Sequence, residues 1–419
     1  METFDTVVVG AGQAGVAMSE HLGNLGIDHV VLERDRIAER WRTGRWDSLV
    51  ANGPAWHDRF PNMQFPCDGD DFPGKETVAA YFEAYAEKID APIRTGVEVV
   101  AVKPQSGGFL VETSDGSIEA KHVVAATGPF QRPFIPPMVP SKAGVFQLHS
   151  ADYRNPDQLP EGGVLVVGGG SSGSQISDEL RQSGRKVYLS IGAHDRSPRS
   201  YRGRDYCWWL GVLGKWNIDT PGPGTEHVTI AVSGADGGKT VDFRKLAQEG
   251  VTVLGMTESY GDGKLRFKPD LRENLDAGDA YYLSILDEAD AYADRYSLDL
   301  PEEPEARIIP GDAPCIADPV LDLDIEAESI NTILWATGYR FDYSWIHADT
   351  FDETGRPLHQ RGVSNHPGLY FIGLPWQTRR GSSFIWGVWH DAKFIADQIA
   401  IQNAYMDYHF GRAAAAALR

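Results

Sequence analysis

Two glycine-rich loops of the same type limit the possible folds of this chain more than any other feature. The first is VVVGAGQAG at 7–15, and the second is VVGGGSSGS at 166–174. Each follows an apolar segment typical of a buried parallel strand and precedes a segment typical of a helix. Loops of this kind hold the pyrophosphate of a dinucleotide at a helix N-terminus. We therefore expect an α/β protein with two Rossmann-like dinucleotide-binding domains.

The first loop lies in the sequence context that such a fingerprint requires. Gly10, Gly12 and Gly15 give the GxGxxG spacing, and the strand after the predicted helix ends at Glu33. The glycines allow a tight turn, close approach of the backbone to the pyrophosphate, and close packing of helix on strand. Glu33 has the right spacing for an acid that accepts hydrogen bonds from a ribose. The alternative is a glycine-rich turn without a ligand.

The second loop repeats this spacing but lacks the acid. Gly168, Gly170 and Gly173 form the fingerprint, and the positions equivalent to the acid are the uncharged Ser190 and Ile191. An acid at this point would repel the 2′-phosphate of NADPH. The missing acid therefore favours NADPH over NADH as the second nucleotide.

An arginine-rich segment, HDRSPRSYRGR, follows the same strand. A guanidinium group can bind a phosphate through two parallel hydrogen bonds. Arg196, Arg199 and Arg202 are therefore the candidate ligands of the 2′-phosphate. The alternative is a solvated surface loop that binds nothing. On the first interpretation, one nucleotide stays bound as the redox centre, while NADPH arrives, delivers hydride and leaves.

The order of the motifs predicts how the chain divides into domains. Two apolar segments that end in Ala-Thr-Gly, HVVAATG and INTILWATG, flank the interval that contains the second loop. We expect residues 1–140 and 330–419 to form one discontinuous FAD-binding domain, with an NADPH-binding domain of residues 141–329 inserted into it. Gly338 in the second Ala-Thr-Gly and Gly373 before the C-terminal helix are further candidate cofactor contacts.

Composition excludes several classes of function. The formal charge of −20 leaves no basic face for a nucleic acid. No apolar run is long enough for a membrane span, and the N-terminus lacks the basic start of a signal peptide. Cys67, Cys207 and Cys315 lie far apart without a CxxC pair. This spacing argues against a metal site and predicts a cytoplasmic protein without disulfides.

The motifs together resemble those of the class B flavin-dependent monooxygenases, a family of two-dinucleotide-binding-domain flavoproteins. The resemblance extends over nearly the whole chain. It includes His149 and Tyr153, which match the HxxxY part of the family's FxGxxxHxxxY or W motif. Ala143 and Val145 stand where the family has Phe and Gly, which indicates a divergent branch.

The resemblance implies an activity and one catalytic residue. NADPH would reduce FAD, O2 would form a C4a-(hydro)peroxyflavin, and this would oxygenate a small organic substrate at nitrogen, sulfur or a ketone. Tyr153 in place of Trp favours nitrogen or sulfur. Asn52, in VANGPAWHD, would lie over the flavin and help to hold the oxygenated ring. The alternative is a turn asparagine, because Asn-Gly-Pro favours turns.

Two other functions stay open. One is an NADPH oxidase, or a reductase that passes electrons to a quinone or protein acceptor without oxygen transfer. The other is a flavin-binding sensor that reports NADPH. The missing CxxC pair argues against a disulfide reductase of the dithiol type. The partners implied are a small-molecule substrate and O2, and a homodimer stays open.

Tryptophans are frequent near the predicted flavin site, and they favour either an aromatic substrate pocket or domain packing. The histidines at 57 and 390 are assigned no catalytic role. The candidates for the pocket are Trp56, Trp376, Trp386 and Trp389.

Overall fold

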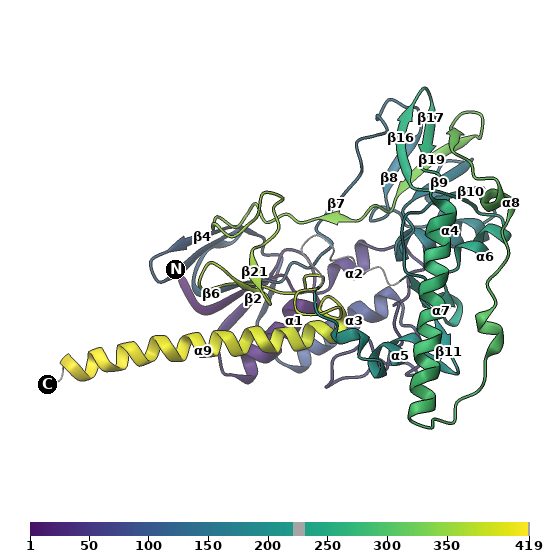
Figure 1. Ribbon diagram of the computed structural model, residues 1–419. Coiled ribbons are helices and arrows are strands. Elements are labelled where there is room, and N and C mark those ends of the chain that lie inside the picture. Colours follow the sequence, from purple (N-terminus) through teal and green to yellow (C-terminus); the bar gives the residue numbers. More distant parts are fainter. Residues whose placement is uncertain (221–230, 418–419) are drawn as a thin grey trace.

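The computed structural model of the chain describes residues 1–220 and 231–417, which fold into two α/β bodies joined by a narrow crossing (Figure 1). The first body carries the loop at 7–15, and the inserted body carries the loop at 166–174. The sheet of the first body is mixed with parallel central strands, the main sheet of the inserted body is wholly parallel, and in each a glycine-rich loop follows a central strand. The predicted fold class, with two Rossmann-like domains, is confirmed. Within the described ranges, no helix is long and apolar enough to cross a membrane.

The sheet of the first body is built around β1 (Glu2–Val9), whose residues Val7 and Val8 are fully buried. This strand pairs in parallel with β2 (His29–Glu33) on one side and with β6 (Gly116–Ala125) on the other. β6 also forms an antiparallel pair with β5. The other strands of this sheet are β3 (Ile93–Thr95), β4 (Val99–Gln105), β5 (Gly108–Thr113), β21 (His359–Gln360), β22 (Val363–Ser364) and β23 (Leu369–Phe371).

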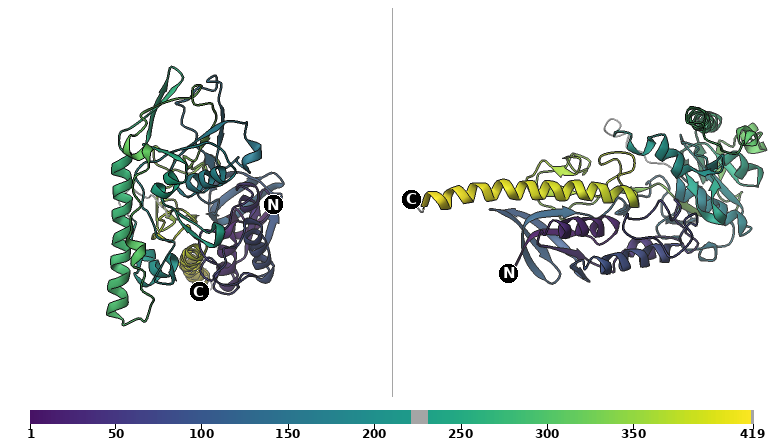
Figure 2. Two further views of the ribbon diagram at one scale, coloured as in Figure 1. Left: turned by 90° about the vertical axis from the view of Figure 1, so that its right-hand side faces the viewer. Right: turned by 90° about the horizontal axis from the view of Figure 1, so that it is seen from below.

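One buried carboxylate ties the helices of the first body together. Glu20 accepts hydrogen bonds from Tyr85 Oη at 2.8 Å, Trp389 Nε1 at 2.7 Å and Asn62 Nδ2 at 2.7 Å. Three bonds compensate the cost of taking this carboxylate out of water. The helices of this body are α1 (Gln13–Asn24), α2 (Glu39–Thr43), α3 (Lys75–Lys88) and α9 (Ile385–Ala417). The last of these continues far beyond the body toward the C-terminus (Figures 1 and 2).

The inserted body has a five-stranded parallel sheet in the order β15, β10, β9, β19, β8. Its buried strands are nearly continuous runs of Val, Leu and Ile, as expected where helices cover both faces. Their bounds are β8 (Phe146–His149), β9 (Gly163–Val167), β10 (Val187–Ser190), β15 (Thr252–Leu254) and β19 (Ile330–Trp335).

Helices and a small antiparallel sheet complete the inserted body. In Figure 1, the long helix α7 runs down its outer side. The helices are α4 (Ser171–Gln182), α5 (Tyr206–Val212), α6 (Phe243–Gln248), α7 (Leu271–Arg295) and α8 (Pro314–Ala317). The small sheet consists of β16 (Thr257–Gly261), β17 (Lys264–Phe267) and β18 (Asp322–Asp324), and two short hairpins join β11 (Ser200–Tyr201) to β12 (Arg204–Asp205) and β13 (Val232–Ser233) to β14 (Lys239–Thr240).

The second Ala-Thr-Gly strand corrects one expected domain boundary. Residues from 330 onward were assigned to the first body, but β19 pairs with β9 and β8 of the inserted body. The pairing continues to Ala336, whose N–H donates to Val167 O at 2.8 Å. The division into FAD-binding and NADPH-binding domains remains a proposal, and these pairings move its second boundary from 330 to just after Ala336.

The two chain passages between the bodies pair with each other. β7 (Arg132–Pro133) and β20 (Tyr339–Arg340) form a short antiparallel ribbon, and Figure 1 shows β7 in the crossing. His149 Nε2 donates to Gly338 O at 2.9 Å, while His149 Nδ1 accepts from Ala151 N at 3.0 Å. The histidine of the HxxxY motif therefore fixes the backbone where the chain leaves the inserted body.

We expect the protein to lose stability as the pH falls below about 6.5, the ordinary pKa of histidine. Burial lowers the pKa of His29, His122 and His149. Below that pH, the unfolded chain binds protons that the folded chain refuses, so folding loses up to about 1.4 kcal/mol per pH unit for each histidine. Urea midpoints at pH 7.5 and 5.5 measure this effect.

A pair of variants checks the cause of this pH dependence. His29→Gln should make the fall in the urea midpoint shallower. His347→Gln, at an exposed position, should leave it unchanged. A midpoint that is equal at both pH values would contradict the assignment of the effect to buried histidines.

Candidate functional site

The first glycine loop forms a cradle at the start of α1. Gly10 has φ +106°, and a Cβ atom there would lie 2.8 Å from Ala126 O. A Cβ atom at Gly15 would overlap the carbonyl oxygen of Gly10. By contrast, a Cβ atom at Gly12 would have no neighbour within 4 Å. The loop thus needs glycine at 10 and 15 for its own packing, and at 12 it leaves open space.

This open space belongs to a cavity of about 550 Å³ in the first body. Gly10, Gly12, Glu33 and Gly373 all line it. Glu33 accepts hydrogen bonds from Ala11 N at 2.8 Å and from Asp35 N at 2.9 Å, so its carboxylate is fixed at the end of β2. A phosphate-accepting helix N-terminus and a fixed acid fit the pyrophosphate and ribose of a dinucleotide.

The second loop reproduces the first at the start of α4. Gly168 has φ +117°, and a Cβ atom there would overlap Ala336 O. A Cβ atom at Gly173 would overlap Gly168 O, as in the first loop. Gly170 is the N-cap of α4 with extended backbone angles, and it lines a second cavity. The loop fits a second dinucleotide pyrophosphate.

This second cavity, the central cavity, has a volume of about 610 Å³ and lies between the two bodies. Gly168 and Gly170 line it from the inserted body, Gly338 lines it from the crossing, and Asn52 and Asp58 line it from the first body. The central cavity therefore joins the expected second nucleotide to the residue that was expected to lie over the flavin.

A hydrogen-bond network between the bodies orients Asn52. Gln175 Nε2 donates to Asn52 Oδ1 at 2.8 Å and to Val232 O at 2.9 Å. Arg199 Nη1 donates to the backbone oxygen of Asn52 at 2.5 Å. Because Oδ1 accepts a bond, the Nδ2 group of Asn52 remains as a donor for the cavity. No sequence pattern predicted a role for Gln175, which lies on α4.

Two of the predicted phosphate ligands are buried and already paired. Arg196 donates to Asp279 at 2.5 Å and to Asp242 at 2.6 Å, and it is 7% exposed. Arg199 is 5% exposed and donates to both oxygens of Asp205, at 2.7 and 2.6 Å.

The third arginine is engaged in the same way. Arg202 donates to Asp290 at 3.1 Å and to Glu302 at 2.8 Å. These contacts disagree with the 2′-phosphate role expected for all three arginines, because each guanidinium already donates to carboxylates and a phosphate would have to replace them. Their contacts make them structural residues of the inserted body.

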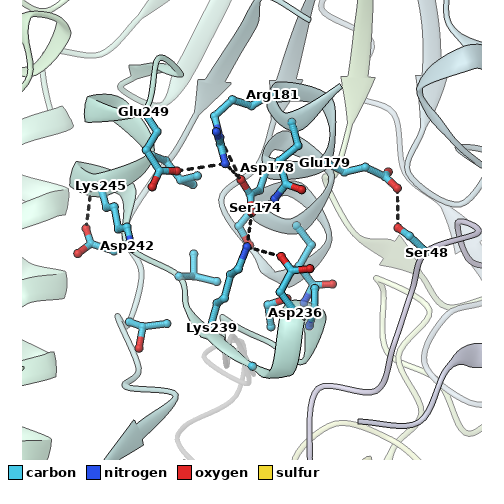
Figure 3. A pocket seen from close by; sticks show the side chains of 18 of the residues that line it. Ser48, Ser174, Asp178, Glu179, Arg181, Asp236, Lys239, Asp242, Lys245 and Glu249 are labelled. Carbon is cyan, nitrogen blue, oxygen red and sulfur yellow. Dashed lines mark hydrogen bonds and ion pairs between the residues drawn. The ribbon is translucent and has the colours of Figure 1, made fainter. Parts of the chain in front are cut away.

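A third cavity of about 810 Å³ lies beside α4 and α6 (Figure 3). Its charged side chains neutralise one another. Lys239 pairs with Asp178 and Asp236, and Arg181 pairs with Asp178 and Glu249. Because these charges pair with one another, the third cavity has little net charge to attract a ligand, and we assign this cavity no role.

The four tryptophans predicted for the pocket are not among the residues that line the central cavity in the described part of the chain. Trp389 donates to Glu20, and Trp386 packs on Trp216 with ring centroids 5.3 Å apart. The cavity-lining tryptophans are Trp41, Trp46 and Trp216. The residues that sequence reasoning missed at this site are Arg45, Asp58, Gln175, Tyr206, Cys207, Leu210 and Trp216.

Comparisons with known proteins agree with this architecture. Residues 7–210 match the family described as pyridine nucleotide-disulphide oxidoreductase. An uncharacterized CzcO-like oxidoreductase of Geobacillus kaustophilus is 35% identical over 94% of this chain and 98% of its own length. A probable indole-3-pyruvate monooxygenase of Arabidopsis thaliana, YUCCA4, is 32% identical over 94% of this chain and 90% of its own length.

Solved structures share the fold. A flavin monooxygenase variant from Stenotrophomonas maltophilia superimposes with a TM-score of 0.68 at 19% identity, covering 96% of this chain and 99% of its own. OTEMO in complex with FAD and NADP superimposes with a TM-score of 0.55 at 15% identity, covering 97% of this chain and 86% of its own.

We expect a side chain added at Gly12 to impair FAD binding, and one added at Gly170 to impair reduction by NADPH. Gly12→Val should fold but purify colourless, with at least about tenfold weaker FAD binding, because its side chain enters the first cavity. Gly170→Val should stay yellow but accept no electrons from NADPH. Flavin content and anaerobic reduction measure the two effects.

The matched control for these variants is Gly74→Val, another helix N-cap with extended angles and no neighbour within 4 Å of a Cβ atom. It should retain both FAD and reduction. A colourless Gly170 variant with a yellow Gly12 variant would reverse the assignment of the two loops.

The structural role of Arg196 predicts a large loss of stability on its removal. Arg196→Met should lower the free energy of unfolding by about 3–5 kcal/mol, because two buried carboxylates lose a partner. Urea denaturation measures the loss. Arg204→Met, at an exposed position, serves as the control. An Arg196 variant of normal stability that binds NADP+ weakly would restore the phosphate role.

Proposed function

This chain belongs to the flavin-dependent monooxygenase family, and from that premise we propose that it transfers one oxygen atom from O2 to a small organic substrate, using FAD and NADPH. The observation that carries this proposal is that two dinucleotide cradles open toward one place, where Asn52 lines the cavity between the bodies.

We assign one cofactor to each cradle. Gly10, Gly12, Glu33 and Gly373 would hold FAD, and Gly168, Gly170 and Gly338 would hold NADPH. When bound, NADPH supplies hydride, and FAD accepts it and activates O2. The side chains around the central cavity would exclude water and orient the hydrogen-bond donor for the reaction.

The central cavity suits a reaction that must exclude water and protein nucleophiles. Leu210, Phe384 and Ile385 give it apolar walls. Asn52, held by Gln175, directs an N–H donor that can stabilise negative charge on oxygen. Cys207 is the only cysteine among the lining residues of the described chain, and burial raises the pKa of its thiol. A dithiol reductase mechanism has no second thiol here.

The lining residues favour a small apolar or aromatic substrate. Tyr206 and Trp216 add aromatic faces to the apolar walls. We propose oxidation at nitrogen or sulfur ahead of a ketone, on the basis of Tyr153. The YUCCA relative is named for a substrate with an aromatic ring, which agrees with the aromatic lining of the cavity. A cytoplasmic location stays part of the proposal, since all three cysteines are free thiols.

Rapid mixing tests the function directly. The protein is reduced with NADPH without oxygen and then mixed with oxygenated buffer while its absorbance spectrum is recorded. A transient spectrum, distinct from those of reduced and oxidised flavin, supports oxygen transfer. Direct return to oxidised flavin with release of peroxide would favour the oxidase or reductase. Failure of NADPH to reduce the flavin would favour the sensor.

We expect Asn52→Ala to shorten the lifetime of this transient at least about tenfold, the effect of losing one well-placed donor. Flavin reduction by NADPH should keep its rate, since Asn52 acts after that step. Asn52→Asp, which keeps the size but loses the N–H donor, should behave like Asn52→Ala. Unchanged lifetimes in both variants would make Asn52 a turn residue only.

A further inference from the structure

Recognition of the 2′-phosphate separates NADPH from NADH, and it needs a cation at the ribose end of the second nucleotide site. We propose that this enzyme discriminates weakly between the two coenzymes and uses NADH beside NADPH. The inference rests on the proposed function, because it concerns the nucleotide that the second loop would bind.

Three of the arginines that follow β10 supply no free cation, and the exposed fourth, Arg204, lies 5.5 Å from the Trp208 ring and does not line the central cavity. Arg196 and Arg202 each donate to two carboxylates, and Arg199 donates to Asp205 and to the backbone of Asn52. All three are less than 9% exposed. The Arg196 guanidinium also lies 4.2 Å from the Tyr282 ring, which holds it on the α7 side of the loop.

The end of β10 carries neither a cation that would bind a 2′-phosphate nor an acid that would bind a 2′-hydroxyl. Gly168 N donates to Ser190 O at 2.9 Å, just as Gly10 N donates to Leu32 O at 2.8 Å. This register makes Ile191 the equivalent of Glu33. Ile191 is 1% exposed and has no charge. An acid that would favour the free 2′-hydroxyl of NADH, and reject NADPH, is therefore missing as well.

His194 does not replace the missing cation. It lines the central cavity three residues beyond Ile191, and its ring is packed 4.7 Å from the Phe243 ring. His194 Nδ1 donates to Gly192 O at 3.0 Å. Burial lowers the pKa of His194, which keeps the ring neutral near pH 7. Exposed Asp195 follows directly and adds negative charge.

Arg45 is the one cation among the described residues that line the central cavity. It lies where this cavity meets the first one, because it lines both and its guanidinium is 4.4 Å from the Phe130 ring. That position suits the flavin side of the site and not the end of β10. The segment 221–230, outside the described residues, contains neither lysine nor arginine.

Binding of the oxidised coenzymes tests the inference without turnover. NADP+ and NAD+ are titrated into the FAD-loaded protein by calorimetry at low and high salt. We expect dissociation constants within about tenfold of each other, because both coenzymes use the same pyrophosphate cradle. Their ratio should change little with salt, because no ion pair holds the 2′-phosphate. NADP+ binding more than tenfold tighter would overturn the inference.

One exposed position allows the missing cation to be added. Ala193 is exposed and lines the central cavity, so a side chain there can reach the ribose without disturbing the core. Ala193→Arg should raise the preference for NADP+ at least about tenfold and make it sensitive to salt. Ala193→Glu, the matched control of opposite charge, should lower it. A preference unmoved by either variant would place the ribose elsewhere and overturn the inference.

Anaerobic reduction separates this inference from the proposed function. Flavin reduction by NADPH and NADH at similar rates supports both. Reduction by NADPH alone overturns the inference and leaves the monooxygenase proposal intact. Reduction by neither coenzyme overturns the proposed function, while the calorimetric ratio still decides the inference.

Discussion

Two missing Cβ atoms set the architecture of both bodies. The backbone of Gly15 and that of Gly173 each pack against the carbonyl oxygen of the first glycine of their loop. A Cβ atom at either position would lie 1.8 Å from that oxygen, so no other residue fits. This contact lets a helix begin directly where a central strand ends. The N-terminus of α1 and that of α4 are therefore aimed at a phosphate position by steric necessity. The neighbouring Ala-Thr-Gly segments close against Gly10 and Gly168 in the same way, so the two cradles repeat each other down to the backbone contacts.

Duplication of the loop alone would give two separate nucleotide sites. The crossing between the bodies brings these two sites to one shared cavity. The β7–β20 ribbon holds the two chain passages together, and His149 fixes the oxygen of Gly338 beside it. Asn52 then receives bonds from Gln175 and Arg199, both on the inserted body. The side chain proposed to act at the flavin is thus positioned by the domain that would bring the reductant. Its orientation therefore depends on the relative position of the two bodies.

Local patterns could predict the parts of the fold that local physics determines. Strand–glycine–helix spacing gave both cradles, the α/β class and the position of Glu33, because these depend on neighbours in sequence. The boundary at 330 was wrong because an apolar strand does not reveal its partner strand, and β19 pairs with β9 of the inserted body. The tryptophan prediction failed for a similar reason. Trp216 lines the cavity from a short helical turn that has no sequence signature, while the Nε1 group of Trp389 donates to Glu20 of α1.

The arginine cluster shows why charge must be interpreted against the whole composition. Acidic residues outnumber basic ones by 59 to 39 in this chain, so a buried guanidinium readily finds carboxylates on neighbouring elements. Burial of an arginine without such partners would be costly, and pairing is the condition for packing it at all. The partners Asp279 and Asp290 come from α7, more than eighty residues beyond the loop, and sequence spacing cannot reveal them. The segment that resembled a phosphate site instead fastens one wall of the central cavity to α7 and to Asn52, so its charges serve the geometry of the site.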